Sequence, residues 1–475
     1  MKTWFTNIKK VYIIGIGGTG TSGLAKIFKA LGKQVEGSDI RKTAQTEKLE
    51  NFGIRVFYQH NPTNITDDID LAIRSQAVNF ENPECQRAKE LNIPVISYPR
   101  ALGLLMLEKR GLAIAGTHGK TTTSAMTVFM LKKLGYDPDF VIGGEIPGLG
   151  NSGVGSNDIL VVEACEYKRS FLNLSPEVGI ITSIEEDHLD YYRDLEDITN
   201  AFEDFSERIQ PGGKIIGMVD DPVVRRVIKN CGAISLGYGI ESGEIKAKNI
   251  RFSEDGNRFD CYRGDEKLGE VYMPVFGKHN VLNALAAISA GIVLGMPFSA
   301  IAMALSDFPG VCRRSQIIAH VDDVMIVDDY GHHPTEIVAT LKGLRQRFPS
   351  RKIIAVFQPH QYSRTRFLLD DFASSFRLAD RVIVPDIYFV RDSENERKLV
   401  NSEMLVERMI RNGTDAKYIS NFEDIAIDPQ GNVVAIGVTN KSTSVPGLKP
   451  VLVKLNSSGM EVFTKVFFAD TVDNQ

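Results

Sequence analysis

Apolar and polar residues alternate along the chain in blocks that predict successive α/β units. Val11–Ile16 is a short apolar run with β-branched members, which is typical of a strand buried on both faces. A glycine turn follows, then helical spacing over Thr21–Leu31 and a second strand over Gln34–Ser38. The alternation continues to a helix that begins at Pro99, and it predicts a parallel α/β domain over residues 1–109.

Two further units follow the first. The second covers residues 110–312 and begins with the strand GLAIAG, followed by DILVVEA and VGIITSI. Turn sequences at Glu254–Gly256 and Arg263–Gly264 predict antiparallel hairpins between about 232 and 275. The third unit covers residues 313–426, with strands VMIVDDY, KIIAVFQP and RVIVPDIY separated by helical stretches. Residues 427–475 differ from all three, because they read as β-strands around turns.

Composition narrows the class of protein. The 475 residues are 43% hydrophobic and 24% charged, which argues against a wholly disordered or collagen-like chain. Lys plus Arg number 55 against 60 Asp plus Glu, so nucleic acid is not expected as the main partner. No apolar run reaches 18 residues, so we expect no membrane insertion. The 5 cysteines are scattered and form no CxxC, which favours a reduced, cytoplasmic protein.

The first candidate site is the glycine turn after the first strand. Gly15, Gly17, Gly18, Gly20 and Ser22 lie where a strand gives way to a helix, and Asp39 ends the next strand. Backbone N–H groups of such a turn can hold a diphosphate, and an acid at this distance can meet a ribose hydroxyl. A turn without a ligand, or the nucleotide site of a nicotinamide or flavin enzyme, would also fit this motif alone.

The second candidate site is a phosphate loop between a strand and a helix. It is made up of Gly116, Thr117, His118, Gly119, Lys120, Thr121 and Thr122. Backbone amides would surround the phosphates, Lys120 would supply a positive charge, and the Thr121 hydroxyl would bind Mg²⁺. Ile114 stands where the strict pattern has a glycine, so the loop is a variant. A hydride-transfer enzyme does not need such a lysine, which disfavours a dehydrogenase.

Two acidic motifs follow later strands of the second unit. Glu163-Ala-Cys-Glu166 comes directly after DILVV, where a carboxylate beside a phosphate loop can hold Mg²⁺. Asp187-His188-Leu-Asp190 comes after VGIITSI. A solvated pair of acids and a hydrogen-bonded structural histidine are the alternatives for these two motifs.

Three further motifs lie at strand or helix ends. GKHNVLN places Asn280 and Asn283 on one helical face, suited either to an adenine edge or to helix capping. DDYGHHP begins at Asp328, and QPHQYSRT begins at Gln358. Both follow strands of the third unit, at the sheet edge where ligands bind. Six of the 8 histidines lie in the motifs of the second and third units taken together.

In this order, GTHGKTTT, EACE, DHLD, GKHNVLN, DDYGHHPTE and FQPHQYSRT resemble the Mur ligase family over about residues 8–425. The turn GIGGTGTSG and the last two phrases are most similar to the members that add L-alanine to UDP-N-acetylmuramate. The resemblance implies a three-domain α/β fold. It comprises a Rossmann-like N-terminal domain for the UDP-sugar, a central P-loop ATPase-type domain and a Rossmann-like C-terminal domain for the amino acid.

The resemblance also implies a reaction and the residues that carry it. ATP would phosphorylate the lactyl carboxylate of the sugar nucleotide, and the alanine amine would attack the acyl phosphate. The implied catalytic residues are Lys120, Glu163, His188, His332 and Arg364, and the implied ligands of Mg²⁺ are Thr121, Glu163 and His188. The phosphate-loop residues with His279, Asn280, Asn283, Arg314 and Asp329 would bind ATP. His332, His360 and Arg364 would position the amino acid.

Some positions depart from the family pattern. Ser183 stands where Asn is common, and Ser315-Gln316 stands where Phe-Glu is usual. Cys165 replaces a frequent Asp, and we expect it to be a buried small hydrophobe. The family's third unit ends with a helix and a strand, which the segment 427–475 does not resemble. We therefore expect this segment to pack poorly or to form a separate hairpin sheet, leaving the third unit without a helix and an edge strand.

The implied function leaves alternatives. A related ligase that recycles peptides, a folate polyglutamate synthase, and a non-ligating nucleotide-binding homologue share parts of the motif set. The folate enzyme is disfavoured because the N-terminal glycine domain would be superfluous. We expect a monomer or weak homodimer.

Overall fold

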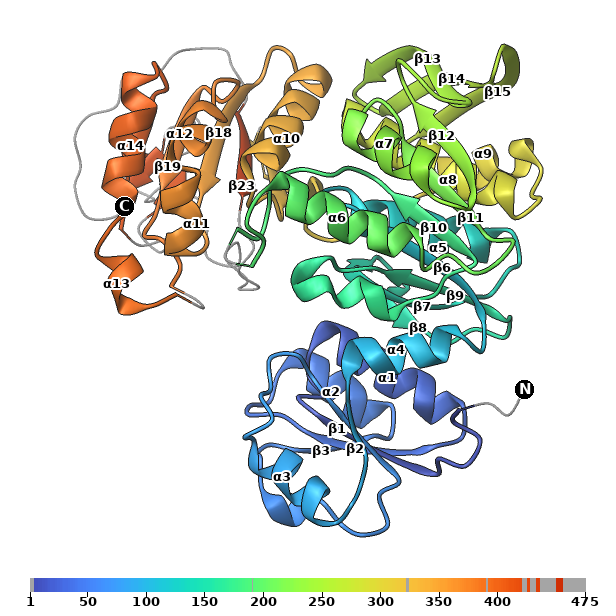
Figure 1. Ribbon diagram of the computed structural model, residues 1–475. Coiled ribbons are helices and arrows are strands. Elements are labelled where there is room, and N and C mark those ends of the chain that lie inside the picture. The colour runs from blue at the N-terminus through green and yellow to red at the C-terminus, as the bar shows by residue number, and fades with distance from the viewer. Residues whose placement is uncertain are drawn as a thin grey trace, which may run out of the picture. The chain divides into compact units, whose positions relative to one another are not determined.

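The computed structural model describes residues 4–189, 191–321, 324–389 and 392–420, with the backbone of three later strands. The chain divides into two compact units. The first comprises Met1–Ile250, Arg258–Met273 and Val281–Pro309, and the second comprises Arg251–Asn257, Pro274–Asn280 and Gly310–Gln475. Figure 1 shows the three main sheets of these units with their helices.

The N-terminal sheet has five parallel strands in the order β3-β2-β1-β4-β5. Its elements are β1 (Lys10–Ile14), α1 (Thr19–Ala30), β2 (Gln34–Ser38), α2 (Ala44–Asn51), β3 (Arg55–Phe57), η1 (Pro62–Asn64), β4 (Leu71–Arg74), α3 (Pro83–Glu90), β5 (Val95–Ser97) and α4 (Tyr98–Met106). The β1 residues Val11 and Ile13 belong to the main core, whereas Tyr12 and Ile14 belong to a second cluster of buried residues. This strand is therefore buried on both faces, as its apolar run predicts.

The central sheet has ten strands in the order β15-β14-β13-β12-β11-β10-β6-β9-β7-β8. Its elements are β6 (Arg110–Ala115), α5 (Lys120–Lys133), β7 (Asp139–Ile146), β8 (Gly150–Gly153), β9 (Ile159–Glu163), η2 (Tyr167–Asn173), β10 (Val178–Ile181), α6 (Leu195–Ser206), β11 (Lys214–Met218), α7 (Pro222–Asn230), β12 (Ile234–Gly239), β13 (Ile245–Ser253), β14 (Gly256–Arg263), β15 (Glu266–Met273), α8 (Lys278–Val293) and α9 (Phe298–Ser306). Strands β7, β9, β6, β10, β11 and β12 are parallel. Two-residue connections join β13, β14 and β15 at the turns expected from the sequence.

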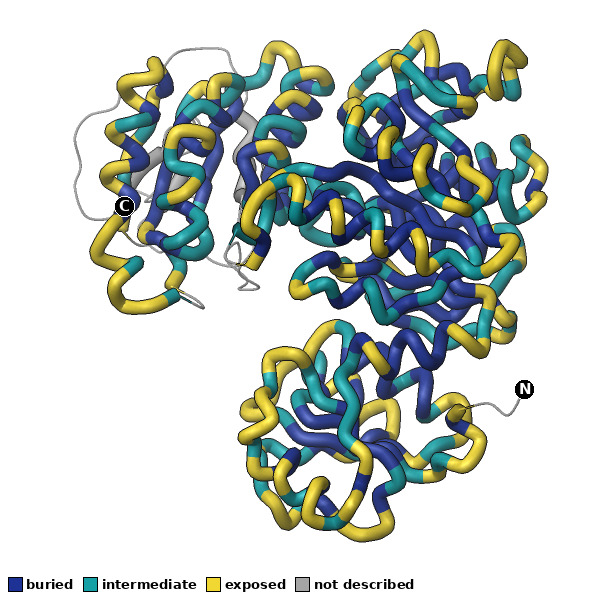
Figure 2. The backbone as a smooth tube through the Cα atoms, in the orientation of Figure 1, coloured by how far each residue is buried: buried dark blue, intermediate teal, exposed yellow. Residues whose placement is uncertain are grey.

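The C-terminal sheet has six strands in the order β16-β17-β23-β18-β19-β20. Its elements are β16 (Gln316–Val321), β17 (Val324–Asp329), α10 (Pro334–Arg347), β18 (Lys352–Phe357), α11 (Tyr362–Phe367), α12 (Leu369–Ser374), β19 (Arg381–Val384), α13 (Glu394–Arg397), α14 (Ser402–Arg411), β20 (Ala416–Tyr418) and β23 (Pro450–Leu455). Only β16 is antiparallel to its neighbour among these pairings. Figure 2 shows β18 and β19 as mostly buried and the outward faces of the helices as more exposed.

The segment 427–475 behaves only partly as expected. Strands β21 (Ile425–Ile427) and β22 (Val433–Ala435) form a separate two-stranded antiparallel sheet, which agrees with one of the two alternatives. However, β23 pairs in parallel with both β17 and β18 inside the C-terminal sheet, so the expectation that the whole segment packs poorly on the third unit is wrong for this strand. The physical reason is that β17 and β18 would otherwise each leave a row of backbone groups unpaired. The remainder of this segment lies outside the described residues.

Among the described residues, no helix is long and apolar enough to cross a membrane.

Candidate active site

The phosphate loop connects β6 to α5 and depends on two glycines. Gly116 and Gly119 have φ angles of +133° and +82°, which side chains rarely adopt. A Cβ at Gly116 would also collide with the Thr182 hydroxyl. The loop is held by Ser183, whose Oγ accepts a hydrogen bond from the His118 backbone N–H at 3.0 Å. Ser183, which departs from the family pattern, therefore shapes the loop directly.

Lys120 begins α5 and has three acceptors in this loop. Its Nζ lies 2.5 Å from the Gly116 carbonyl, 3.0 Å from the Thr117 carbonyl and 3.0 Å from Glu166 Oε1. An ammonium has three N–H donors, so these acceptors engage all of them. Burial alone would lower the pKa of Lys120, but Glu166 and the neighbouring Cys165 and Glu163 together outweigh it, and the pKa lies above its usual value.

Glu166 is buried beside Lys120 and His188. Burial alone would raise the pKa of Glu166, whereas Lys120 and His188 lower it below its usual value overall. Both members of the Lys120–Glu166 pair are therefore charged at neutral pH. The other carboxylate oxygen, Oε2, is buried and has no hydrogen-bond partner among the described residues.

The three predicted metal ligands fall into two groups. Thr121 Oγ1 donates to Glu163 Oε1 at 3.0 Å, and the backbone N–H of Gly143 donates to Glu163 Oε2 at 2.7 Å. His188 lies instead with Glu166 and Asp187, and one ligand atom from each lies within 4.8 Å of the other two. Sequence reasoning included Glu166 and Asp187 in motifs but gave neither a role. Asp190 lies outside the described residues.

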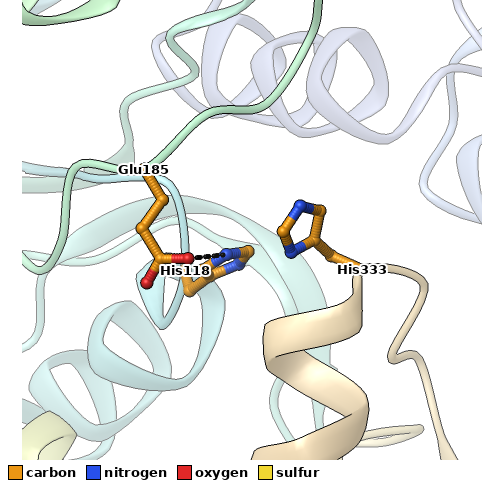
Figure 3. A group of neighbouring side chains, drawn as sticks. All are labelled: His118, Glu185 and His333. Atoms are coloured by element: carbon orange, nitrogen blue, oxygen red, sulfur yellow. Dashed lines mark ion pairs between the residues drawn. The ribbon is translucent and has the colours of Figure 1, made fainter. Parts of the chain in front are cut away.

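His118 and Glu185 form an ion pair at the side of the loop. His118 Nε2 lies 3.5 Å from Glu185 Oε2, as the dashed line in Figure 3 shows. The backbone N–H of Glu185 also donates to Thr117 Oγ1 at 2.9 Å. Glu185 was missed by sequence reasoning, although it lies in the same loop as the DHLD motif.

The amide side chains at the start of α8 have defined contacts. Asn283 Oδ1 accepts a hydrogen bond from Thr123 Oγ1 at 3.2 Å, and it lies so close to Gly119 that a Cβ there would come within 2.6 Å. Asn280 Nδ2 donates to the Phe276 carbonyl at 2.8 Å. Asn283 therefore lies against the phosphate loop, on the helix expected to approach the nucleotide.

Cys165 corrects one expectation. The sequence predicted a buried small hydrophobe, but Cys165 is exposed. It follows the end of β9, where the chain leaves the sheet, although desolvation by the surrounding groups still raises the pKa of its thiol to about 12.

Asp329 and its neighbours form a cluster after β17. Asp329 Oδ2 accepts hydrogen bonds from the Ser315 backbone N–H at 2.7 Å and from Ser315 Oγ at 2.9 Å. Burial raises the pKa of Asp329 above its usual value, although the Arg314 guanidinium opposes this. Glu336 on α10 lies 3.5 Å from Arg314 and 3.4 Å from His332. The structure thus brings Arg314 and His332 to Glu336, with Asp329 close enough to Arg314 to feel its charge.

His360 and Arg364 lie after β18. The His360 ring stacks on Tyr388 with centroids 5.5 Å apart. Arg364 is in α11, whose first backbone N–H groups, at Tyr362 and Ser363, donate to the Asp392 carboxylate. Because β17 and β18 are both parallel to β23, their carboxyl ends meet at the same edge of the sheet. His332, His360 and Arg364 therefore follow that edge.

The N-terminal glycine turn is closed by β2. The backbone N–H groups of Gly15 and Ile16 donate to the Ser38 carbonyl at 2.8 and 2.9 Å. Gly17 N–H donates to Asp39 Oδ2 at 2.8 Å. The Gly17 N–H, which a bound diphosphate would use, is therefore already hydrogen-bonded to Asp39. A diphosphate would have to compete with the Asp39 carboxylate for it.

The remaining turn residues pack tightly. A Cβ at Gly20 would collide with the Tyr98 ring, and one at Gly18 would lie 2.9 Å from Thr21 Oγ1. Ser22 Oγ donates to the Thr19 carbonyl at 3.0 Å and accepts from Gln45 at 2.6 Å. The predicted glycines therefore allow close approach of backbone and side chains.

Three family models match the chain in succession. They are the Mur ligase family, catalytic domain, over residues 10–110, the Mur ligase middle domain over 114–291, and the Mur ligase, glutamate ligase domain, over 313–428.

Similar proteins match nearly the whole chain. The UDP-N-acetylmuramate–L-alanine ligase of Clostridium kluyveri is 40% identical over 424 residues, covering 89% of this chain and 92% of that protein. The enzyme of the same name from Clostridium novyi is 42% identical over 429 residues, covering 90% and 93%. The crystal structure of UDP-N-acetylmuramate-alanine ligase from Thermotoga maritima has a TM-score of 0.77 at 28% identity, covering 96% and 97%. A murein peptide ligase from Psychrobacter arcticus has a TM-score of 0.69 at 26% identity, covering 96% and 98%.

Proposed function

This chain belongs to the Mur ligase family, and we propose that it joins L-alanine to UDP-N-acetylmuramate with hydrolysis of ATP, as an ATP-dependent ligase of peptidoglycan precursor synthesis. The observation that carries this proposal is the identity of 40–42% over about nine-tenths of the chain to enzymes of that name. The Lys120 loop supports it, because a triphosphate must be bound beside the carboxylate that it activates.

The reaction begins with two anions that repel each other. The lactyl carboxylate attacks the γ-phosphate, ADP leaves, and the alanine amine then displaces phosphate from the acyl phosphate to form the amide. The Lys120 ammonium and the backbone N–H groups of the phosphate loop would stabilise the charge that develops. To bind phosphate, Lys120 has to exchange at least one of its three present acceptors.

The donor sets fit divalent cations. Thr121 and Glu163 offer two oxygen ligands beside the phosphate loop, as Mg²⁺ prefers. The orphaned Glu166 Oε2, together with Asp187 and His188, would hold a second cation. Bound Mg²⁺ would neutralise phosphate charge and polarise the phosphoryl oxygens.

We assign the remaining binding roles to the three sheet domains in turn. Residues 1–109 would bind the UDP-sugar through the glycine turn and Asp39. Residues 110–312 would bind ATP, with His279, Asn280 and Asn283 at the adenine and Arg314 and Asp329 reaching the nucleotide. Residues 313–426 would bind alanine, with Arg364 gripping its carboxylate and His332 and His360 close by. We further propose that the protein is cytoplasmic and that it is a monomer or a weak homodimer. Sedimentation would test the oligomeric state.

Phosphate release tests the function directly. Purified protein is given ATP, Mg²⁺ and UDP-N-acetylmuramate with each amino acid in turn. We expect release to require both the sugar nucleotide and an amino acid, with L-alanine the best substrate. A peptide ligase, suggested by the resemblance to the Psychrobacter structure, would instead prefer a peptide to a single amino acid. Equal release without the sugar nucleotide would indicate a plain NTPase.

A further inference from the structure

A fully buried carboxylate lies in the N-terminal sheet domain, away from the phosphate loop. Glu84, in the first turn of α3, has no exposed surface. Its oxygens lie within hydrogen-bond distance of Tyr12 Oη (2.9 Å), Ser38 Oγ (2.5 Å), Asn64 Nδ2 (2.7 Å), His60 Nδ1 (3.0 Å) and the Asn61 backbone N–H (3.3 Å). A buried charge is costly unless it is fully hydrogen-bonded, so this network holds its members in fixed positions.

The network is joined to the candidate sugar-nucleotide turn through Ser38. The Ser38 hydroxyl contacts Glu84, while its carbonyl accepts hydrogen bonds from Gly15 and Ile16. The next residue, Asp39, accepts from Gly17. His60 follows the end of β3, the strand beside β2. His60 and Asp39 therefore follow neighbouring parallel strands at the same edge of the sheet.

The hydrogen bonds determine which His60 nitrogen carries the proton. Ser38 Oγ has one proton, and its short contact to Glu84 Oε2 uses it. His60 Nδ1 lies 3.0 Å from the same carboxylate oxygen and 3.0 Å from Ser38 Oγ, neither of which has a proton left to donate to it, so Nδ1 must carry a proton of its own. A neutral imidazole protonated at Nδ1 presents Nε2 as an acceptor. The His60 side chain is 17% exposed, and the nitrogen away from Glu84 is the one available to a ligand.

We propose that His60 Nε2 accepts a hydrogen bond from the N3–H of uracil and selects uridine over cytidine nucleotides, with Glu84 as the residue that positions it. In a doubly wound sheet, the acid after β2 marks the ribose. The base then lies toward the edge strand β3 and its His60 loop. Uracil N3 carries a proton, whereas cytosine N3 is an acceptor and would face the Nε2 lone pair. This inference rests on the proposed use of a UDP-sugar.

The test is calorimetric binding of UDP and of CDP to the full chain, without ATP or amino acid. We expect wild type to bind UDP on the order of 10–100-fold more tightly than CDP, since one hydrogen bond is exchanged for an unpaired acceptor. His60→Ala should weaken UDP binding and bring the ratio close to one. His320→Ala, which removes an exposed histidine on β16, should leave the ratio unchanged.

The variant Glu84→Gln tests whether Glu84 acts by positioning the His60 ring and its proton, without touching the base itself. Its amide N–H would donate to His60 Nδ1, move the proton to Nε2 and favour CDP relative to wild type. General loss of fold would instead weaken UDP and CDP equally, so the wild-type ratio would persist in the remaining binding, and that result would overturn the inference. If the wild type ligates alanine to UDP-N-acetylmuramate but binds UDP and CDP equally, the role of His60 is refuted while the proposed function stands. Absence of that ligation would instead overturn the proposed function.

Discussion

Replacing Glu166 by Gln should make the empty enzyme bind nucleotide more tightly. In the structure Glu166 holds the Lys120 ammonium at 3.0 Å, and the Lys120 and Glu166 side chains are only 14% and 4% exposed. Phosphates must therefore compete with a carboxylate for the same lysine. The amide of Gln keeps the shape and an acceptor but removes the charge.

The magnitude follows from the change in that hydrogen bond. Two unit charges 3.0 Å apart attract by about 5 kcal/mol at an effective dielectric constant of about 20, and desolvation offsets most of this. A net hydrogen bond to a charged group is worth about 1.5–3 kcal/mol, and we assign the upper end of this range to the ammonium with a carboxylate and the lower end to the ammonium with an uncharged amide oxygen. The difference of about 1–1.5 kcal/mol corresponds to a roughly 5–15-fold lower Kd.

The assay is equilibrium binding of a non-hydrolysable ATP analogue in EDTA, so that no cation contributes. Glu163→Gln is the matched control, because it removes the same charge from the site, but Glu163 bonds to Thr121 and Gly143 and not to Lys120. We expect less than a twofold change in that control. Unchanged affinity in Glu166→Gln, or an equal gain in the control, would refute the competition for Lys120.

Three further outcomes are expected. Lys120→Ala should lower turnover by about 10²–10³ or more while circular dichroism stays normal, and near-normal phosphate release would contradict its role. Arg364→Ala should mainly raise the KM for L-alanine, and a change confined to the KM for ATP would place it at the nucleotide. Burial and Arg314 lower the pKa of His279 to about 4, so between about pH 6.5 and 4 only the unfolded chain takes up this proton. The free energy of unfolding should therefore fall by about 2 kcal/mol from this residue between pH 7 and 5, less so in His279→Gln, as measured by urea denaturation.

The order of strands, helices and glycine turns could be predicted from the sequence, because it depends on local periodicity and backbone freedom. The run before Gly116 is a buried strand, Lys120 begins a helix, and Asn280 and Asn283 lie in one helix, as expected. The motifs also indicated which loops carry polar chemistry, since the carboxyl ends of parallel strands share an edge.

Which polar groups meet was decided only by the tertiary structure. EACE contains two acids three residues apart, and no local rule says that Glu163 contacts Thr121 while Glu166 contacts Lys120. His188 therefore lies with Glu166 and not with Glu163. His60 lies outside every motif, and local sequence does not predict its contact with Glu84. The two residues are 24 positions apart in the chain and meet only because the strands and helices of the N-terminal sheet pack together.

The segment 427–475 shows that local sequence also does not determine which strands pair. Its sequence predicted β-strands, and strands form, but their partners depend on where unpaired backbone is available. β23 lies between β17 and β18, two strands that come about a hundred residues or more before it in the chain. Strand pairing satisfies N–H and C=O groups irrespective of distance along the sequence. Local pattern therefore determined that PVLVKL is extended, and only the sheet that receives it determined its place.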